Sequence, residues 1–428
     1  MKIFLKKYQL YFFIALSTLP WWWLLTQLNA FGTIATLANT AGLMGGTLLI
    51  WQVILSHRFL AKKFTDDYQQ LITVHILLGT YGTLLVLVHP LLILQVYSQD
   101  ALFLILPQFE TRFNVAVTAG RIAWWLWWLV WLTSAVLRKR IAYRLWQYLH
   151  YLSWIMVAFV LIHSRQIGTF LNTFPWLMSY WNILTSIFIG LVLWRLAQVF
   201  NLGRARYQLI KKEKDAAEVT VYTFQPLGQQ KLQPTVGQFV YLKPNFFGEA
   251  HPFTVMSFDE KTGQLQFGIK AVGRFTRQLE QLRVGDRVFI DGPYGIFTQA
   301  GQNNEPKVII AGGIGITPFV ELIRRFGQHR TKLFYANRYL EDALLREEFQ
   351  QQLGENYLEV ISREKKPPQP VIAGRISKSV LAANLTKKEL QQAKFFICGS
   401  PGFTQTVRKI IAQLEIPPER VFAEEFEL

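Results

Sequence analysis

The chain has 428 residues, of which 51% are hydrophobic, 15% aromatic and 17% charged. Because apolar residues are abundant and charges are few, this composition excludes a disordered protein and argues against one that is wholly soluble in water. The formal net charge of +17 has no nucleic-acid recognition motif beside it, so nucleic acid is not expected as a partner.

The first 200 residues differ from the rest in composition. All fourteen tryptophans lie at or before Trp194, and this half holds only four acidic residues, Asp66, Asp67, Asp100 and Glu110. Apolar runs of about 20 residues, the length that crosses a lipid bilayer, predict six membrane spans, at about 9–28, 39–56, 68–96, 115–137, 145–164 and 179–199. We therefore expect an all-α six-helix membrane bundle over residues 1–200.

Basic residues set the expected orientation of these spans. They gather at the N-terminus and after the second and fourth spans, as Lys2, Lys6, Lys7, Arg58, Lys62, Lys63, Arg138, Lys139, Arg140 and Arg144. Segments rich in Lys and Arg stay on the cytoplasmic side of a membrane. We expect a multi-pass protein of the plasma membrane with both termini in the cytoplasm.

Two predicted spans each carry two histidines, which are costly inside a bilayer and therefore need a reason. His75 and His89 lie in the third span, and His150 and His163 lie in the fifth, 14 and 13 residues apart. Because imidazole is a common axial ligand of haem iron, we expect two bis-histidine b-type haems. The shared direction of the two spans pairs His75 with His150 at the inner level and His89 with His163 at the outer level.

Thirteen residues fall short of four helical turns. We therefore expect the fifth span to contain a π-bulge or kink, or to offer its ligands at different angles. His57 is expected to be solvated. Arg121 and Arg165 are candidates to pair with a haem propionate, and Arg165 could instead attract an anion or be a snorkelling surface residue. The alternative interpretation of the whole chain is a six-span channel or transporter with a cytoplasmic regulatory nucleotide domain. The four histidines would then form a proton relay.

The second half begins with short alternating runs and then changes pattern. The runs VTVYTF, QFVYLKP, PFTVMSF, LQFGIKAV and RVFIDG predict an antiparallel β-barrel over residues 201–300. From Lys307, an apolar strand leads into a glycine turn and a helix, and further strand candidates recur at KLFYAN, YLEVIS and KFFICGS with helical stretches between them. This pattern predicts an α/β domain with a parallel sheet of nucleotide-binding type over residues 301–428. Gly312, Gly313 and Gly315 form a turn between the first strand and a helix, and Thr317-Pro318 is expected to begin that helix. We expect this turn to bind a pyrophosphate through its backbone N–H groups.

Several motifs resemble a known family. His251-Pro252-Phe253-Thr254 is similar to the flavin-binding motif of the ferric reductase and NADPH oxidase superfamily. The segments AGGIGITPF and CGSPGF resemble the nicotinamide-cofactor segments of ferredoxin-NADP reductases, and the histidine spacings resemble those of NADPH oxidases. The chain as a whole resembles a bacterial NADPH oxidase. This resemblance implies that the barrel binds FAD and that the α/β domain binds NADPH.

The resemblance also implies the roles of individual residues. The FAD-binding candidates are His251, Pro252, Phe253, Thr254, Lys270, Arg274 and Thr276, of which Thr276 is expected to cap the following helix. The NADPH-binding candidates are Gly312, Gly313, Gly315, Thr317, Pro318, Arg338, Ser362, Arg363, Cys398 and Gly399. The candidates closest to the reacting rings are Thr254 at the flavin N5 edge, Cys398 as a packing contact of the nicotinamide, and Phe426 covering the flavin.

The expected activity follows from these cofactors. NADPH would reduce FAD, and the two haems would carry single electrons to an external acceptor. The resemblance favours oxygen as the acceptor, which makes the chain a superoxide-forming NAD(P)H oxidase; a ferric chelate is the alternative. No regulatory segment is visible in the sequence, so no obligatory regulatory protein is expected.

Overall fold

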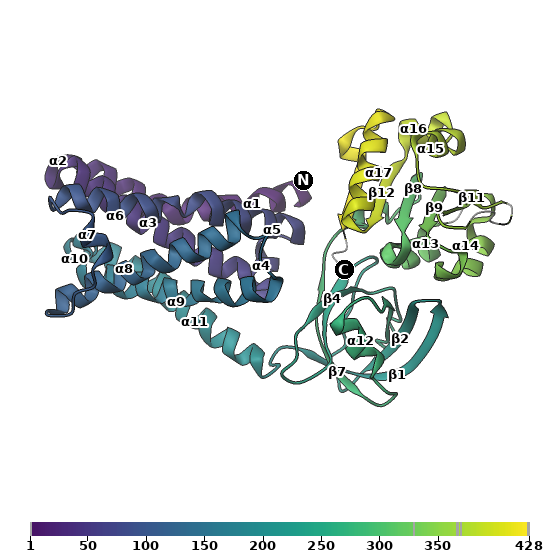
Figure 1. The fold of residues 1–428 in the computed structure, drawn as a ribbon, viewed down its shortest axis with the longest axis horizontal. Helices are drawn as coiled ribbons and strands as arrows, with labels where there is room; N and C mark the ends of the chain where they lie inside the picture. The colour runs from purple at the N-terminus through teal and green to yellow at the C-terminus, as the bar shows by residue number, and fades with distance from the viewer. Residues whose placement is uncertain (1, 328–329, 365–367, 369, 426–428) are drawn as a thin grey trace. The chain divides into compact units, whose positions relative to one another are not determined.

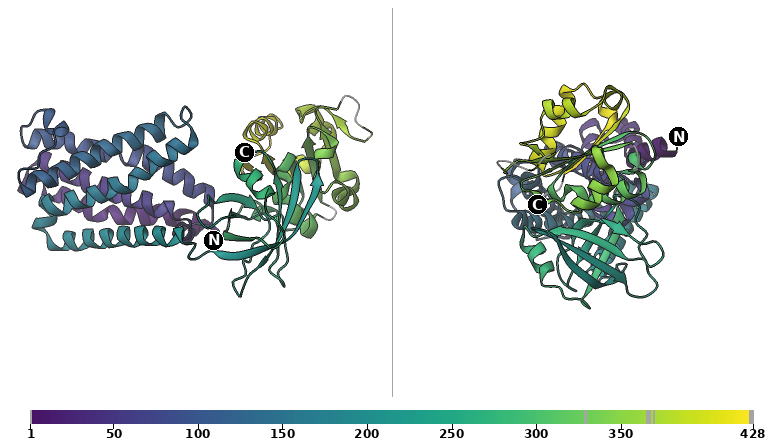
Figure 2. Two further views of the ribbon diagram at one scale, coloured as in Figure 1. Left: turned by 60° about the horizontal axis from the view of Figure 1, so that its bottom comes forward. Right: turned by 90° about the vertical axis from the view of Figure 1, so that its right-hand side faces the viewer.

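The computed structural model describes residues 2–327, 330–364, 368 and 370–425. It divides into two compact units, Met1–Leu196 and Ala197–Leu428. The first unit is built from helices that run alongside one another, and the second from two sheets with their helices (Figure 1). Figure 2 shows the same elements from two further sides.

Long helices make up most of the first unit. They are α1 (Lys2–Trp23), α3 (Thr33–Ser56), α5 (Tyr68–Leu77), α6 (Leu84–Val96), α8 (Arg112–Trp131), α9 (Tyr143–Ile167) and α11 (Pro175–Val199). Short helices lie between them, namely α2 (Leu28–Phe31), α4 (Arg58–Phe64), α7 (Leu102–Ile105) and α10 (Thr169–Thr173). Two π-helical segments, Leu78–Gly82 and Leu132–Val136, follow α5 and α8.

Polar side chains fix where two of these helices begin. Asp67 precedes α5 and accepts hydrogen bonds from the backbone N–H groups of Gln69 and Gln70, at 2.9 and 3.2 Å. Thr111 precedes α8 and accepts from the N–H of Asn114 at 3.1 Å. Such caps satisfy backbone donors that a helix leaves unpaired.

Five of the described helical stretches are long and apolar enough to cross a membrane. They are Thr33–Ser56, Tyr68–Val96, Arg112–Val136, Tyr143–Ile167 and Pro175–Val199. The first predicted span falls on α1, which is not among the five. The predicted count of six spans is therefore not confirmed.

Helix α1 nevertheless packs into the bundle. Trp21 is completely buried, and its Nε1 donates a hydrogen bond of 2.7 Å to Thr47 Oγ1 on α3. Its ring also meets that of Trp181 on α11 edge-on, with 5.7 Å between the ring centroids. These contacts join the first helix to the second and last predicted spans.

The second unit starts with a seven-stranded antiparallel sheet. Its strands are β1 (Ala205–Ala216), β2 (Val219–Pro226), β3 (Phe239–Lys243), β4 (His251–Thr254), β5 (Ser257–Phe258), β6 (Leu265–Lys270) and β7 (Arg287–Tyr294), in the order β4-β3-β7-β1-β2-β6-β5. No pairing joins β4 to β5 among the described strands, so closure into a barrel is not confirmed. The sequence interpretation also missed β1, whose second half carries the charged run KKEKD.

A six-stranded parallel sheet follows. It contains β8 (Lys307–Gly312), β9 (Thr331–Asn337), β10 (Tyr357–Ile361), β11 (Ile372–Ala373), β12 (Lys394–Gly399) and β13 (Val421–Glu425), in the order β11-β10-β9-β8-β12-β13. The strand order reverses between β8 and β12. Ligands of such sheets bind where the order reverses, at the carboxyl ends of the strands.

Helices cover both faces of this parallel sheet. On one face Ile309 of β8 shares a core with Phe349 of α14 (Arg346–Leu353). On the other face Ile310 shares a core with Ile411 of α17 (Pro401–Gln413). Further helices of this domain are α13 (Val320–Phe326), α15 (Lys378–Asn384) and α16 (Lys387–Gln392).

Ionic and polar contacts connect the two sheets of this unit. Ser257 of β5 donates a hydrogen bond of 2.7 Å to Glu321 of α13, and Glu321 also pairs with Arg325 at 2.8 Å. Arg325 pairs in turn with Glu260 at 2.8 Å and lies 4.6 Å from the ring of Phe258. Glu321 is buried and also pairs with Arg324 at 3.4 Å, so it has three partners. These charge-assisted contacts hold the antiparallel sheet against the domain that contains the parallel sheet.

Candidate functional site

The four intramembrane histidines form two facing pairs. The ring centroids of His75 and His150 are 6.1 Å apart, and those of His89 and His163 are 6.2 Å apart. Two imidazole rings bound to opposite sides of one metal ion by bonds of about 2 Å have centres roughly 6 Å apart. The structure thus brings together the pairs that the sequence predicted, at a separation that fits an iron between each pair.

Backbone carbonyl groups orient the rings of the second pair. The Nδ1 atoms of His89 and His163 lie 2.7 and 3.0 Å from the carbonyl oxygens of Ala38 and Ala116. Because a carbonyl oxygen only accepts, each Nδ1 carries the hydrogen, and this leaves Nε2 as the atom that can bind a metal.

Two glycines leave room for these same rings. A Cβ atom on Gly42 would lie 2.7 Å from Nδ1 of His89, and one on Gly120 would lie 2.5 Å from Nδ1 of His163. Both distances are shorter than any ordinary contact. The sequence interpretation did not single out either glycine, although an isolated glycine inside an apolar helix often marks a close approach.

The other pair has different partners. Nδ1 of His150 lies 3.1 Å from the hydroxyl oxygen of Ser134, which also accepts a 3.1 Å hydrogen bond from Nε1 of Trp146. The Trp146 ring stacks on His150 with 5.0 Å between centroids, and the guanidinium of Arg138 lies 4.5 Å from the Trp146 ring. The Nδ1 atom of His75 is buried without a hydrogen-bond partner among the described residues.

The predicted π-bulge lies in a different span. Helix α9, which carries His150 and His163, is α-helical throughout, so a π-bulge in the fifth span was wrong, while the alternatives of a kink or of ligands offered at different angles stay predictions. Instead the π-helical segment Leu78–Gly82 lies between His75 and His89. A π-bulge takes up one extra residue in a turn, so these 14 residues wind the helix about as far as 13 residues of α9 do.

His57 is not solvated, contrary to the prediction. Its side chain is 2% exposed, and neither ring nitrogen has a hydrogen-bond partner among the described residues. Its ring meets that of Trp154 on α9 edge-on, at 5.6 Å between centroids. Burial here depends on packing against a helix distant in sequence.

The two singled-out arginines have partners in the protein. Arg121 is 4% exposed; its Nε donates to the carbonyl oxygen of Phe103 at 2.5 Å, and its guanidinium lies 4.6 Å from the Phe103 ring. Arg165 is exposed and donates to Asn182 Oδ1. Each arginine is therefore held by neighbouring residues of the bundle.

In the second unit the predicted flavin motif forms strand β4. Its four residues pair with β3, with His251 opposite Leu242 and Thr254 opposite Phe239. The imidazole of His251 stacks on Phe275 of α12 (Arg274–Glu280) at 3.9 Å between centroids. Phe253 lies 5.9 Å from the same ring. Aromatic faces and a strand edge together suit a planar ring system.

The predicted cationic contacts of FAD, Arg274 and Lys270, each pair with a carboxylate of the same domain. Arg274 contacts a carboxylate oxygen of Glu249 at 3.3 Å, and His251 lies 3.5 Å from the other oxygen of that carboxylate. Lys270 pairs with Glu218 at 2.5 Å. Such donors fit the anionic pyrophosphate of a dinucleotide.

Thr276 does not cap its helix in the predicted way. Helix α12 starts at Arg274, so Gly273 is its N-cap and Thr276 is its third residue. The Thr276 hydroxyl oxygen accepts from the backbone N–H groups of Gly273 and Val272, at 2.9 and 3.0 Å. It stabilises the start of the helix from within its first turn.

The predicted glycine turn lies where the order of the parallel strands reverses. Gly313 has φ +54°, a conformation that favours glycine. A Cβ on Gly315 would lie 2.4 Å from the carbonyl oxygen of Cys398, and Cβ atoms on Gly312 and Gly399 would meet the ring of Phe403. Gly315 therefore lets the turn after β8 approach the end of β12, and Gly312 and Gly399 leave room for Phe403 of α17.

The helix after this turn begins later than predicted. Gly313–Phe319 is a 3₁₀-helix that contains Thr317 and Pro318, and α13 begins at Val320. Thr317 and Pro318 therefore belong to the connecting turn and not to the first turn of the α-helix. The hydroxyl of Thr317 donates to the carbonyl of Ile314 at 3.1 Å.

Cys398 is a core residue of β12. Its side chain is completely buried, and burial, together with the nearby Glu424, raises the pKa of its thiol well above the ordinary value. Only the thiolate reacts with alkylating agents. The position suits a packing contact and not a nucleophile.

We expect this burial to make Cys398 inert in the folded protein. Iodoacetamide at about pH 8 should alkylate it at least about tenfold more slowly than in the urea-unfolded chain, as peptide mass spectrometry would show. The unfolded chain serves as the control, since Cys398 is the one cysteine of the sequence. Equal rates in the two samples would contradict the buried position.

Three predicted NADPH contacts meet at the ends of β9 and β10. The backbone N–H of Ser362 donates to the carbonyl of Asn337 at 3.1 Å, and that of Arg363 donates to the carbonyl of Arg338 at 3.0 Å. The side chains of Arg338, Ser362 and Arg363 are exposed. Phe426 lies outside the described residues.

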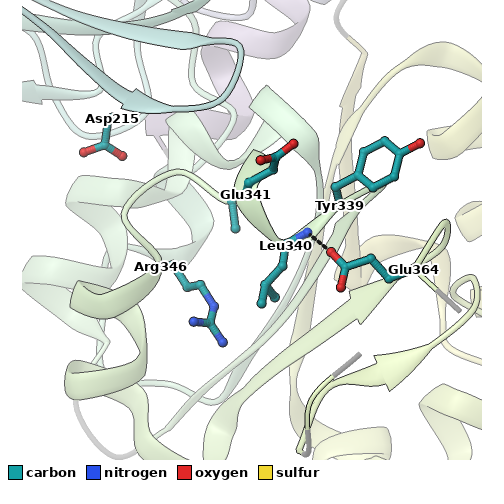
Figure 3. A pocket seen from close by; sticks show the side chains of 7 residues that line it. Asp215, Tyr339, Leu340, Glu341, Arg346 and Glu364 are labelled. Carbon is teal, nitrogen blue, oxygen red and sulfur yellow. Dashed lines mark hydrogen bonds between the residues drawn. The ribbon is translucent and has the colours of Figure 1, made fainter. Parts of the chain in front are cut away.

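A pocket of about 680 Å³ adjoins this edge (Figure 3). The backbone N–H of Leu340 donates a 2.6 Å hydrogen bond to Glu364, which ties the loop after β9 to the loop after β10. The residues that line the pocket are Asp215, Tyr339, Leu340, Glu341, Ala343, Arg346 and Glu364. Sequence reasoning missed all seven, since they come from three separate segments.

Three family models match successive parts of the chain. Residues 41–164 match the ferric reductase like transmembrane component, residues 206–299 the oxidoreductase FAD-binding domain, and residues 309–409 the oxidoreductase NAD-binding domain. The chain therefore has the domain composition of a ferric reductase/NADPH oxidase-like fusion. Such a fusion supports electron transfer from NAD(P)H across a membrane.

Curated relatives match about half of the chain. NADH-cytochrome b5 reductase 1 of Laccaria bicolor is 26% identical over 244 residues, covering 52% of this chain and 79% of the relative. NADH-cytochrome b5 reductase 2 of Homo sapiens is 27% identical over 237 residues, covering 46% and 86%. Among solved structures, the flavohem-like FAD/NAD binding domain of nitric oxide dioxygenase from Vibrio cholerae is 20% identical with a TM-score of 0.46, covering 52% and 98%.

Proposed function

We propose that the fusion transfers electrons from cytoplasmic NADPH across the plasma membrane to external oxygen and forms superoxide. The observation that carries this proposal is the pair of facing histidine couples, with centroids 6.1 and 6.2 Å apart. When bound, FAD supplies hydride and one-electron chemistry, and the two b-type haems supply one-electron chemistry. The protein residues bind and orient these groups.

The proposed division of labour follows the three parts of the chain. His75 with His150, and His89 with His163, would hold the haems in the membrane half, residues 1–200. Residues 201–300 would hold FAD through the segment His251–Thr254 and through Lys270, Arg274 and Thr276. Residues 301–428 would hold NADPH through the glycine turn and through Arg338, Ser362, Arg363, Cys398 and Gly399, with both chain termini in the cytoplasm.

Arg363 is expected to favour NADPH over NADH. An arginine that binds the adenosine 2′-phosphate contributes a charge-assisted hydrogen bond worth about 1.5–3 kcal/mol. Arg363→Ala should therefore lower kcat/KM for NADPH by about 10- to 150-fold and leave kcat/KM for NADH nearly unchanged. Steady-state oxidation of each nucleotide measures both values.

Arg287→Ala is the matched control, because Arg287 is an exposed arginine at the start of β7. It should change neither value. Equal losses for both nucleotides in Arg363→Ala would contradict the proposed contact between Arg363 and the 2′-phosphate. A higher kcat/KM for NADH than for NADPH in the unmodified protein would support NADH as the donor, the nucleotide for which the relatives are named.

Cytochrome c reduction separates the possible acceptors. Detergent-solubilised protein is given NADPH and cytochrome c in air, with and without superoxide dismutase. Loss of the signal with dismutase supports superoxide as the carrier. Persistence of the signal supports direct reduction of other acceptors, and a ferric chelate then becomes the leading substrate, in keeping with the ferric reductase-like model over residues 41–164.

The same preparation tests two simpler points. A haem absorption spectrum and NADPH consumption are both expected, and the absence of both would favour the proton-relay transporter. Because no obligatory regulatory protein is proposed, the purified chain should oxidise NADPH alone; dependence on an added partner would contradict that part of the proposal.

A further inference from the structure

We propose that Ser134 is a positioning residue that fixes the His150 ring and lowers the reduction potential of the haem that His150 binds. This inference rests on the proposed haem ligation and adds a residue that controls it. It depends on how the Nδ1 atoms of the four histidines are hydrogen-bonded, which differs from one histidine to the next.

The Nδ1 atom of His150 has one hydroxyl within hydrogen-bond distance. If Nε2 binds iron, as the carbonyl partners of His89 and His163 indicate for those rings, then Nδ1 of His150 carries a hydrogen. The acceptor within reach is the Ser134 hydroxyl oxygen at 3.1 Å. An acceptor at this position orients the ring and makes the ligand more basic.

The Ser134 hydroxyl is a weak acceptor for His150. The Ser134 oxygen also accepts a hydrogen bond from Nε1 of Trp146 at 3.1 Å, so it is shared between two donors. A shared hydroxyl is a weaker acceptor than the carbonyls of Ala38 and Ala116. The described partners of Nδ1 thus range from a carbonyl for His89 and His163, through a shared hydroxyl for His150, to none for His75.

The acceptor at Nδ1 affects the reduction potential of a haem that the histidine binds. A more basic imidazole stabilises the ferric form of a haem relative to the ferrous form, and so lowers the midpoint of the one-electron couple. Removing the Ser134 oxygen should therefore raise that midpoint. Removing the Trp146 N–H should leave the Ser134 oxygen to accept from His150 alone, and so lower the midpoint.

The local fold supports a specific role for Ser134. It lies in the π-helical segment Leu132–Val136 at the end of α8, and such segments are frequent at functional sites. The neighbouring Thr133 hydroxyl donates to the carbonyl of Leu129 at 2.7 Å, within its own helix. The Ser134 hydroxyl instead lies within reach of α9, which carries both Trp146 and His150.

Potentiometric titration of the haem absorption bands in the purified full-length protein tests the proposal. In Ser134→Ala, one midpoint is expected to rise by roughly the equivalent of a tenfold change in electron affinity, about 59 mV for one electron. In Trp146→Phe, which keeps an aromatic ring against His150, the same midpoint should fall. Ser134→Thr keeps the hydroxyl and should restore the wild-type value.

Ser164→Ala is the matched control, because Ser164 follows His163 but its hydroxyl donates to the carbonyl of Val160 at 2.7 Å. It should leave both midpoints unchanged. Two outcomes overturn the inference, provided that all variants retain haem. Either Ser134→Ala leaves both midpoints unchanged, or Ser134→Ala and Trp146→Phe shift the midpoint in the same direction. A wild-type protein without haem bands would instead overturn the proposed function, so the two failures are distinguishable.

Discussion

Replacing His150 with alanine is expected to remove one of the two proposed haems and to stop NADPH-driven electron transfer. The ring of His150 faces His75 at 6.1 Å, and a haem left with one axial protein ligand is held far more weakly. The haem-to-protein ratio, measured by a pyridine haemochrome assay, should fall from two to one. Cytochrome c reduction should fall by about 100-fold or more.

His75→Ala should give the same result, because both side chains belong to one pair. The control is His57→Ala, which removes a buried histidine of the same bundle that lies against Trp154 and belongs to neither pair. This variant should retain both haems. A full haem ratio in His75→Ala and His150→Ala, with His57→Ala unaffected, would refute the assignment of the ligands.

Replacing Gly120 with alanine is expected to weaken binding of the other haem. The added Cβ would lie 2.5 Å from Nδ1 of His163, so the ring must move away from the carbonyl of Ala116 that orients it. Overpacking of this kind costs about 1–3 kcal/mol, which corresponds to roughly 5- to 150-fold weaker retention. Haem content after size-exclusion chromatography in detergent measures the loss.

Gly42→Ala should act in the same way through His89, which a Cβ would approach to 2.7 Å. The control is Gly190→Ala on α11, since no atom lies within 4 Å of a Cβ built there. Retention of both haems in Gly42→Ala and Gly120→Ala would show that the rings can shift without losing their ligand geometry.

The sequence allowed the histidine pairs to be predicted because histidine is conspicuous within apolar spans. The different hydrogen-bond partners of the four Nδ1 atoms could not be predicted. Every residue has a backbone carbonyl group, so nothing in the sequence marks those of Ala38 and Ala116 as the acceptors. The burial of His57 was missed for a related reason: its neighbour Arg58 suggested a solvated edge, whereas the ring contacts Trp154 on a helix far along the chain.

In the second unit, the motifs located the strands better than the turns. Segments such as KLFYAN and KFFICGS became β9 and β12, because buried parallel strands are continuous apolar runs. The start of α12 was placed too late, because threonine is a common N-cap and Gly273 was not considered as one. The pocket residues Tyr339 and Glu364 were missed because parallel pairing alone brings their loops together.

The π-helical segment Leu78–Gly82 also bears on how this half tolerates insertions. One residue added to a regular helix rotates everything beyond it by about 100°, which would turn His89 away from His163 and expose different side chains to lipid. Because the extra residue is confined to one wide turn, the helix beyond Gly82 keeps its orientation. Deleting one residue within Leu78–Gly82 should therefore restore a regular α-helical turn and keep both haems bound.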